Sequence, residues 1–457
     1  MTTKKKYTLN ELKEINKRTI IHPQSVPKDN ADNGPSMIFE KGEGISFTDM
    51  EGNSYIDGIS QLWNVNLGHG NEELAQAAYD QMKTFAYGSQ FYSNSSEPAI
   101  LLAEKLAEYA PGDLNGVFYT SGGSEANETA FKLSRFYWQL QGYKSKNIII
   151  SLKRGYHGVT ISTQRATGIK EYQEFSGSGD PNILNATAHL LNAEKGDRND
   201  PQYEESIRHI VETYGSDRIA AVIIEPIQGA GGVHIPPKGY LQAVRELCDE
   251  QNILMISDEV ICGFGRTGKN FGVNHWNIVP DMISFAKGIT SGCFPLGGVI
   301  LSQKIKDTIN QFDDNLPHGF TYTGHPTACA VGLKNLEIIE RENIISHVAE
   351  MEEELQKGLH HLANKYEYVT NARTVGLLGA FDMMKNPEDN VLFDEGVDAA
   401  GNMVEACSKR GLIIRPFDYE PGMNILAVAP PLNITKEELQ EMINIMDEAL
   451  SEVVSTL

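Results

Sequence analysis

Lys287 ends an apolar run and is followed by glycines and small residues, in the stretch ISFAKGITSGCFPLGGVI. A lysine at this point could simply extend its ammonium group into water from the end of a strand. Alternatively, a partly dry pocket would lower its pKa, and the neutral amine could form a Schiff base with a carbonyl compound. Partners elsewhere in the chain must decide between these two interpretations.

Two carboxylates also follow apolar runs. Glu225 comes after AAVII, and Asp258 comes after ILMIS, 29 residues before Lys287. A carboxylate at the end of a buried strand needs a cation or hydrogen-bond donors, because an unpaired buried charge is costly. Either carboxylate could cap a neighbouring helix, and Asp258 could form a simple ion pair with the lysine.

A glycine-rich turn and an aromatic ring complete this set of side chains. In FYTSGGSEANETAFK, a strand gives way to Gly122, Gly123 and Ser124 and then to a helix, whose N-terminus offers free N–H groups to an anion. In KRGYHG, Tyr156 precedes a histidine, although a turn with a packed tyrosine would explain this motif as well. A lysine, a carboxylate, an anion cradle and a stacking ring are together what pyridoxal phosphate requires.

Short apolar runs that alternate with helical patterns must position these residues. The runs lie between about residues 117 and 302 and read GVFYT, NIIISL, IAAVIIEP, ILMISDE, MISFAKG and PLGGVILS. Such alternation is typical of an α/β fold with a mostly parallel sheet that helices cover on both faces. Ligands of these sheets bind at the carboxyl ends of the strands, so we expect the residues above to surround one crevice.

The remaining segments predict a second, smaller unit. Residues 37–60 read as a short antiparallel sheet with two turns, and the polar segment 170–205 reads as a loop. Beyond them we predict a helix over about 326–365, a strand around 374–383 and a helix around 396–410. Capping boxes, Thr8 with Glu11 and Thr435 with Glu438, open a short N-terminal helix and the final helix. The predicted domains are an N-terminal segment (1–60) that joins the small domain, a large cofactor-binding domain (61–325) and a C-terminal small α+β domain (326–457).

Composition excludes several classes of partner. The 457 residues include 39 Lys plus Arg and 61 Asp plus Glu, a net charge of −22, which argues against nucleic acid or an anionic membrane. Small anions can still bind to backbone amides. The five cysteines form no C-x-x-C pair, so we expect no metal site, no disulfide framework and a reducing, cytoplasmic location. No apolar run approaches about 18 residues, and we expect no membrane span.

Six motifs together resemble the class III (ω-) aminotransferases over nearly the whole chain. They are Ser121 to Asn127, Tyr156 to Gly158, Glu225 with Pro226, DEVICGFGRTG, FAKG and YTGHP. The resemblance implies the pyridoxal-phosphate-dependent transferase fold type I. It also implies a homodimer with shared active sites, in which Thr323 of YTGHP reaches across the interface.

The resemblance assigns roles to the residues found above. Lys287 holds the cofactor covalently and later moves a proton, and Asp258 pairs with the pyridinium nitrogen. Glu225 steadies the cofactor region, while His157 and His325 are interpreted as supporting or packing residues, because the lysine already supplies acid–base chemistry. The other cofactor-binding residues implied are Tyr156 and Val260 on the two ring faces, Gly123 and Ser124 at the phosphate, and Ser121.

Besides Tyr156, which is also expected to contact the substrate, two further residues bear on it. Trp63 stands where the resembling pyruvate-dependent enzymes have a pocket tryptophan, although it is followed by Asn64 where many of them have cysteine; a core aromatic is the alternative. Arg415, between an apolar strand and a proline, could bind a carboxylate bidentately or pair at the surface with Asp418 or Glu420. The resemblance thus implies a ping-pong transamination from an ω-amino donor, such as β-alanine, taurine or putrescine, to pyruvate.

Three other functions compete with this interpretation. Diaminopelargonate aminotransferases belong to the same family, but tend to have two adjacent tryptophans at the position of Trp63 and Asn64. Mutases and decarboxylases use the same fold and cofactor, but would not convert pyruvate stoichiometrically to alanine. A cofactor-binding regulator would normally have a basic DNA-binding segment, against which the charge of −22 counts.

Overall fold

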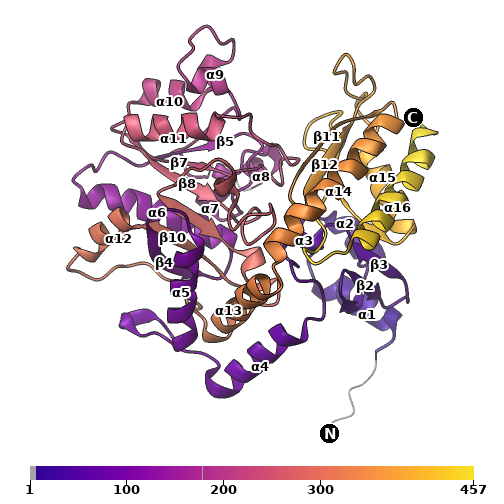
Figure 1. The fold of residues 1–457 in the computed structure, drawn as a ribbon, viewed down its shortest axis with the longest axis horizontal. Helices are drawn as coiled ribbons and strands as arrows, with labels where there is room; N and C mark the ends of the chain where they lie inside the picture. The colour runs from indigo at the N-terminus through magenta and orange to yellow at the C-terminus, as the bar shows by residue number, and fades with distance from the viewer. Residues whose placement is uncertain (1–6, 176, 178) are drawn as a thin grey trace.

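A seven-stranded sheet forms the centre of the chain in the computed structural model, which describes residues 7–175, 177 and 179–457 (Figure 1). The strand order is β4-β10-β9-β8-β7-β5-β6, in which β10 is antiparallel to both neighbours and the pairs from β9 to β6 are parallel. All six predicted runs form strands, and the mostly parallel sheet is confirmed. The strands are β4 (Leu114–Thr120), β5 (Ile148–Leu152), β6 (Ile183–Ala186), β7 (Ile219–Ile224), β8 (Leu254–Asp258), β9 (Met282–Phe285) and β10 (Gly297–Ser302).

Helices cover both faces of this sheet. On one face, Ile149 and Ala221 pack in a core cluster with α6 (Gly123–Leu140). On the other, Ile150 and Val222 pack in a cluster that includes α5 (Glu97–Tyr109) and α11 (Tyr240–Glu250). Successive side chains of a strand point to opposite faces, so a strand that is covered on both sides is apolar at nearly every position.

Two four-stranded sheets lie beside the central one. In the first, β1 (Phe39–Glu43), β2 (Ser46–Asp49) and β3 (Ser54–Asp57) are antiparallel, and β3 pairs in parallel with β13 (Leu412–Ile413). The second is antiparallel in the order β11-β12-β15-β14, with bounds Val369–Val375, Leu378–Met383, Ile425–Val428 and Arg415–Phe417. Figure 1 shows the N-terminal strands beside the C-terminal helices. Both ends of the chain therefore build the part of the molecule that faces the central sheet.

The other helices complete these layers. Both predicted capping boxes are present, and in each the threonine Oγ1 accepts from the glutamate N–H at 3.2 Å. Within the described residues, no helix combines the length and apolar character that crossing a membrane requires. The α-helices not yet named are α1 (Leu9–Thr19), α2 (Pro27–Asn33), α3 (Ser60–Trp63), α4 (Glu72–Phe85), α7 (Ile161–Ala166), α8 (Lys170–Glu174), α9 (Leu191–Glu194), α10 (Ile207–Tyr214), α12 (Gln303–Asn310), α13 (Pro326–Arg341), α14 (Ile344–Lys365), α15 (Ala399–Lys409) and α16 (Lys436–Val454).

Three predicted segments differ from the structure. The helix predicted over 326–365 is divided into α13 and α14, because Asn343 between them has a φ of 53°, a left-handed conformation that ends a right-handed helix. The strand predicted around 374–383 is the end of β11 and the whole of β12, joined by a turn at Gly376 with φ 58°. The segment 170–205, predicted as a loop, contains the short helices α8 and α9 and the strand β6, which is only four residues long and includes Asn185. The domain boundaries stay a prediction.

Candidate functional site

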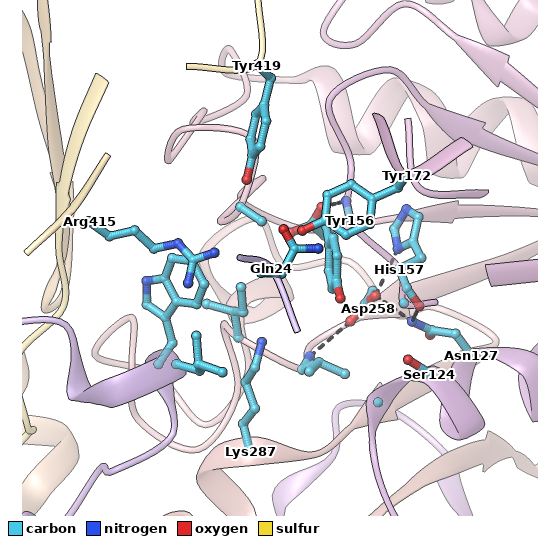
Figure 2. Close-up of a pocket in the computed structure, with 18 residues that line it drawn as sticks. Gln24, Ser124, Asn127, Tyr156, His157, Tyr172, Asp258, Lys287, Arg415 and Tyr419 are labelled. Atoms are coloured by element: carbon cyan, nitrogen blue, oxygen red, sulfur yellow. Dashed lines mark hydrogen bonds and ion pairs between the residues drawn. The ribbon is translucent and has the colours of Figure 1, made fainter. Parts of the chain in front are cut away.

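The carboxyl ends of β5, β7, β8 and β9 and the N-terminus of α6 surround one cavity of about 250 Å³ (Figure 2). Side chains from the C-terminal part of the chain and from the N-terminal segment before α2 close it. The cavity is lined by Gln24, Leu62, Trp63, Gly123, Ser124, Asn127, Tyr156, His157, Gly158, Tyr172, Glu225, Ala230, Asp258, Val260, Ile261, Lys287, Arg415 and Tyr419. The structure therefore gathers the predicted strand-end residues around a single crevice.

Lys287 follows β9 and begins the 3₁₀ helix η4 (Lys287–Thr290), with its side chain directed into the cavity (Figure 2). Its φ of 47° is in the left-handed region, which residues other than glycine adopt rarely and often at functional sites. Burial lowers the pKa of Lys287 to about 8, although the carboxylates of Asp258 and Glu225 act in the opposite direction. The ordinary pKa of a lysine is 10.5, so a far larger fraction of the Lys287 amine is neutral near pH 7 than of a lysine exposed to water.

Asp258, the last residue of β8, is buried and receives three hydrogen bonds. Its Oδ2 atom accepts from Nδ2 of Asn127 at 2.7 Å and lies 2.8 Å from Nδ1 of His157. Its Oδ1 atom accepts from the Val260 N–H at 3.1 Å. A carboxylate oxygen can only accept a hydrogen bond, so Nδ1 of His157 must carry the hydrogen that it donates to Asp258. This bond fixes the orientation of the imidazole ring. Donors around Oδ2 keep the carboxylate turned toward the cavity.

Glu225 holds the segment that carries Tyr156. Its Oε1 atom accepts from the Tyr156 N–H at 2.8 Å, and Oε2 accepts from the Gly229 N–H at 3.0 Å. Burial raises the pKa of Glu225 to about 7. The Tyr156 ring meets Tyr172 of α8 edge to face, with centroids 5.3 Å apart, and burial raises the pKa of Tyr156 to about 12. The tyrosines are thus neutral hydrogen-bonding groups at physiological pH.

The N-terminus of α6 opens into the cavity without a side-chain cap. A Cβ atom on Gly123 would lie 3.1 Å from Cγ1 of Val260, and one on Gly158 would lie 2.4 Å from Oγ of Ser124. Gly158 also has a φ of 122°, which favours glycine. The glycines therefore keep open a space beside the free N–H groups of the helix, which suits a phosphate group.

Trp63 is placed beside both the lysine and the arginine. Nζ of Lys287 lies 5.4 Å and the guanidinium carbon of Arg415 lies 4.9 Å from its ring centroid. The indole stacks on Phe417, with centroids 6.0 Å apart and planes at 4°. Trp63 is both a core aromatic and a cavity residue, so the two interpretations of the sequence are compatible. Asn64 does not line the cavity; its Oδ1 atom accepts from the Leu62 N–H at 3.2 Å.

Two predicted site residues do not line this cavity. Ser121 donates its N–H to Oε2 of Glu125 at 2.8 Å, at the start of α6. Thr323 lies in the turn before α13, where its Oγ1 atom accepts from the Phe320 N–H at 3.0 Å. The cofactor contacts assigned to these two residues stay predictions.

Sequence reasoning gave no role to several residues that face the cavity. Asn127 stands one helical turn after Gly123, and this spacing could have placed both on one face of the helix. Its Oδ1 atom and Nε2 of His157 are buried and lack hydrogen-bond partners among the described residues. Gln24, Tyr172 and Tyr419 come from an exposed N-terminal segment, a short helix and a loop, for which no local pattern indicates a site.

Comparisons of the whole chain agree on one family. The family profile described as aminotransferase class-III matches residues 28–450. The chain is 38% identical over 429 residues to the putrescine–pyruvate aminotransferase of Pseudomonas aeruginosa, covering 92% of each chain. It is 35% identical over 449 residues to the β-alanine–pyruvate aminotransferase of the same organism, covering 96% of each.

Solved structures of transaminases are similar to the whole chain. A transaminase from the marine bacterium Virgibacillus has a TM-score of 0.94 and 44% identity, covering 97% of this chain and 99% of that one. The ω-transaminase of Pseudomonas jessenii in complex with PMP has a TM-score of 0.91 and 32% identity, covering 97% and 98%.

Proposed function

This chain belongs to the class III aminotransferases, which use pyridoxal phosphate, and we propose that it transfers the amino group of an ω-amino acid or amine to pyruvate. The donor gives up its nitrogen and departs as an aldehyde, and pyruvate then takes the nitrogen and leaves as alanine. Donors of the proposed class are β-alanine, taurine and putrescine-like diamines. One observation carries the proposal: Lys287 and Arg415 lie over the same Trp63 ring, at 5.4 and 4.9 Å, so one small molecule can reach both.

The residues around the cavity fit pyridoxal phosphate. The uncapped N-terminus of α6 suits the phosphate, and the buried Oδ1 atom of Asn127 has no partner among the described residues. When bound, pyridoxal phosphate supplies an aldehyde that carries the amino nitrogen and a conjugated ring that withdraws electrons. In the proposed arrangement Asp258 would bind the ring nitrogen, and its negative charge would favour the protonated form of that nitrogen. Tyr156 and Val260 would hold the two faces of the ring, and the N–H groups of Gly123 and Ser124 would bind the phosphate.

Lys287 is proposed as the acid–base residue. With its pKa lowered to about 8, it can be a neutral amine that accepts a proton from the substrate carbon. The ammonium so formed can return that proton on the same side of the cavity. The apolar side chains of Trp63, whose ring centroid lies 5.4 Å from Nζ, and of Ile261 line the same cavity and limit the water in it.

Arg415 is proposed to bind the carboxylate of pyruvate. A guanidinium offers paired N–H donors that match the two oxygens of a carboxylate. Glu225 and Asp258, the two carboxylates of the cavity lining, accept hydrogen bonds from groups other than Arg415. Because neither of them pairs with Arg415, its positive charge is available for the carboxylate of a substrate. A donor without a carboxylate requires this side chain to move aside.

A homodimer with shared sites is part of the proposal. Large apolar side chains around the turn that carries Thr323 are exposed in the single chain, which supports a covering partner. The hydroxyl of Tyr87 donates to the Thr321 carbonyl at 2.8 Å, so two of the exposed segments already form one surface. The exposed residues include Phe85, Tyr87, Phe91, Tyr92 and Tyr322. Light scattering should give the mass of two chains, and equal mixtures of Lys287→Ala and Thr323→Ala chains should regain activity if sites are shared.

A cytoplasmic location completes the proposal. All five cysteines are free thiols, four of them buried, which supports a reducing compartment.

The proposed reaction is tested by supplying pyruvate with one donor at a time and measuring alanine. At least one donor should give alanine and its aldehyde in equal amounts, and 2-oxoglutarate should replace pyruvate poorly. Cofactor-loaded enzyme that forms no alanine from any donor of the class would refute the proposal.

A further inference from the structure

An ion pair joins the two parts of the chain at the edge of the cavity. Nε of Arg154 donates to Oε1 of Glu420 at 3.0 Å, and Nη2 donates to Oε2 at 2.5 Å. Arg154 stands two residues before Tyr156, at the end of the central sheet. Glu420 follows Tyr419 in the loop between β14 and β15, five residues after Arg415. The pair therefore ties the segment of the proposed ring-stacking tyrosine to the segment of the proposed carboxylate-binding arginine.

The Arg154 side of the pair is fixed by its backbone. Its N–H donates to the Gly168 carbonyl at 2.8 Å, and its φ of 61° is left-handed. A Cβ atom on Gly231 would lie 2.3 Å from the Arg154 carbonyl oxygen, so a third segment is packed against it. The guanidinium thus extends from a rigid strand end.

The Glu420 side carries Tyr419, which faces Arg415. Tyr419 lines the cavity together with Arg415, and its hydroxyl is directed toward the guanidinium (Figure 2). Burial raises the pKa of Tyr419 to about 12, and the positive charge of Arg415 opposes part of that rise. Tyr419 also borders a neighbouring cavity that Arg154 and Glu420 line. It is the wall between the two spaces, and a shift of its loop would both open that wall and release Arg415.

We propose that Arg154 and Glu420 are positioning residues that hold Tyr419, and through it Arg415, in the arrangement that binds a carboxylate. The pair favours carboxylate-bearing substrates over neutral amines, because an amine without a carboxylate requires Arg415 to leave. This inference rests on the proposed role of Arg415.

The side chains of the pair are 40% and 51% exposed, which sets the size of the effect. An exposed pair shifts an equilibrium by about two- to fivefold. Such a bias lets both arrangements of Arg415 occur within one catalytic cycle. Two like charges at these positions repel, so single charge reversals should have larger effects than neutral substitutions.

Charge reversal with rescue tests the inference. Arg154→Glu, Glu420→Arg and the exchanged double variant are compared as cofactor-loaded enzymes, with the half-reactions of pyruvate and of benzylamine, an amine without a carboxylate, measured separately. Each single variant should lower kcat/KM for pyruvate about five- to tenfold and leave that for benzylamine unchanged or raised, and the exchanged pair should recover the pyruvate value to within about twofold. Loss without rescue, or equal loss for both substrates, would overturn the inference.

Two additional variants separate this inference from the proposed function. In a Tyr419→Phe background, Glu420→Arg should cause little further loss, because the pair acts through the tyrosine hydroxyl; a full further loss would overturn that step. If Arg415→Ala raises the KM for pyruvate but the reversed pair does not, the inference fails while the proposed function stands. If Arg415→Ala leaves pyruvate unaffected, the proposed carboxylate site itself fails, and the inference with it.

Discussion

Nδ1 of His157 lies 2.8 Å from Oδ2 of Asp258, and both side chains are buried. The histidine is therefore a donor to the carboxylate that faces the cavity, and more than a packing residue. Removing one partner of a buried, charge-assisted contact typically costs about 3–5 kcal/mol. We predict that His157→Phe lowers the thermal midpoint of the apoenzyme and weakens pyridoxal phosphate binding by at least about tenfold.

His157→Gln, which can place an N–H near the same oxygen, is the matched control and should recover part of the affinity. Thermal unfolding and titration of the cofactor absorbance provide the two readouts. Identical cofactor affinity for wild type and the phenylalanine variant would contradict a role for His157 in holding Asp258.

Gly158 gives a steric test of the phosphate site. In Gly158→Ala the new Cβ atom would lie 2.4 Å from Oγ of Ser124, so the hydroxyl or the turn must move. We predict that the dissociation constant for pyridoxal phosphate rises at least about tenfold, a cost of about 1.4 kcal/mol. Gly142→Ala is the control, since its φ of 87° is equally unfavourable for alanine and nothing lies within 4 Å of its Cβ position. A similar loss of affinity in both variants would attribute the effect to backbone strain alone.

The lowered pKa of Lys287 predicts how cofactor loading depends on pH. The neutral amine is the nucleophile, and its population rises as pH increases through about 8, below the ordinary lysine value of 10.5. The rate at which apoenzyme combines with pyridoxal phosphate should therefore rise with a midpoint near pH 8. Stopped-flow absorbance measures this rate, with Nα-acetyllysine as the reference amine. A midpoint for the enzyme that coincides with the reference would mean that burial does not lower the pKa of Lys287.

Arg415 should affect the two substrates unequally. A hydrogen bond to a charged group contributes about 1.5–3 kcal/mol, so Arg415→Ala should raise the KM for pyruvate about 10- to 100-fold. The KM for benzylamine, an amine donor without a carboxylate, should change less than about threefold. Arg410→Ala, which removes an arginine that pairs with Glu452 away from the cavity, is the control. Equal changes for pyruvate and benzylamine would exclude the carboxylate-binding role.

The strand ends that carry the site could be predicted because two features of the sequence mark each of them, an apolar run and the polar turn that follows it. Lys287, Asp258 and Glu225 all stand at the junction of an apolar strand and a polar turn, and parallel topology brings such junctions together. Tyr419 and Gln24 could not be found in this way, because their places depend on how the ends of the chain pack against the central sheet. The strand β6 was missed for a related reason: its four residues form a strand through pairing with β5, which the local pattern does not encode.

His157 and Asn127 illustrate a different limit. Both lie in recognisable motifs, yet a motif does not say which atom a side chain reaches. Only the structure brings both donors to the same oxygen of Asp258. The Arg154 to Glu420 contact spans 266 residues, and no spacing in the sequence indicates it.

The most direct test of the central claim is a stoichiometric half-reaction on the cofactor-loaded enzyme, followed by visible absorbance. An ω-amino donor added alone should bleach the absorbance, and pyruvate should restore it with one alanine formed per site. Lys287→Ala, equally folded and saturated with cofactor, should do neither at a measurable rate. Absorbance that no donor bleaches, or bleaching by the Lys287→Ala enzyme at the wild-type rate, would contradict the proposed roles of the lysine and of the cavity around it.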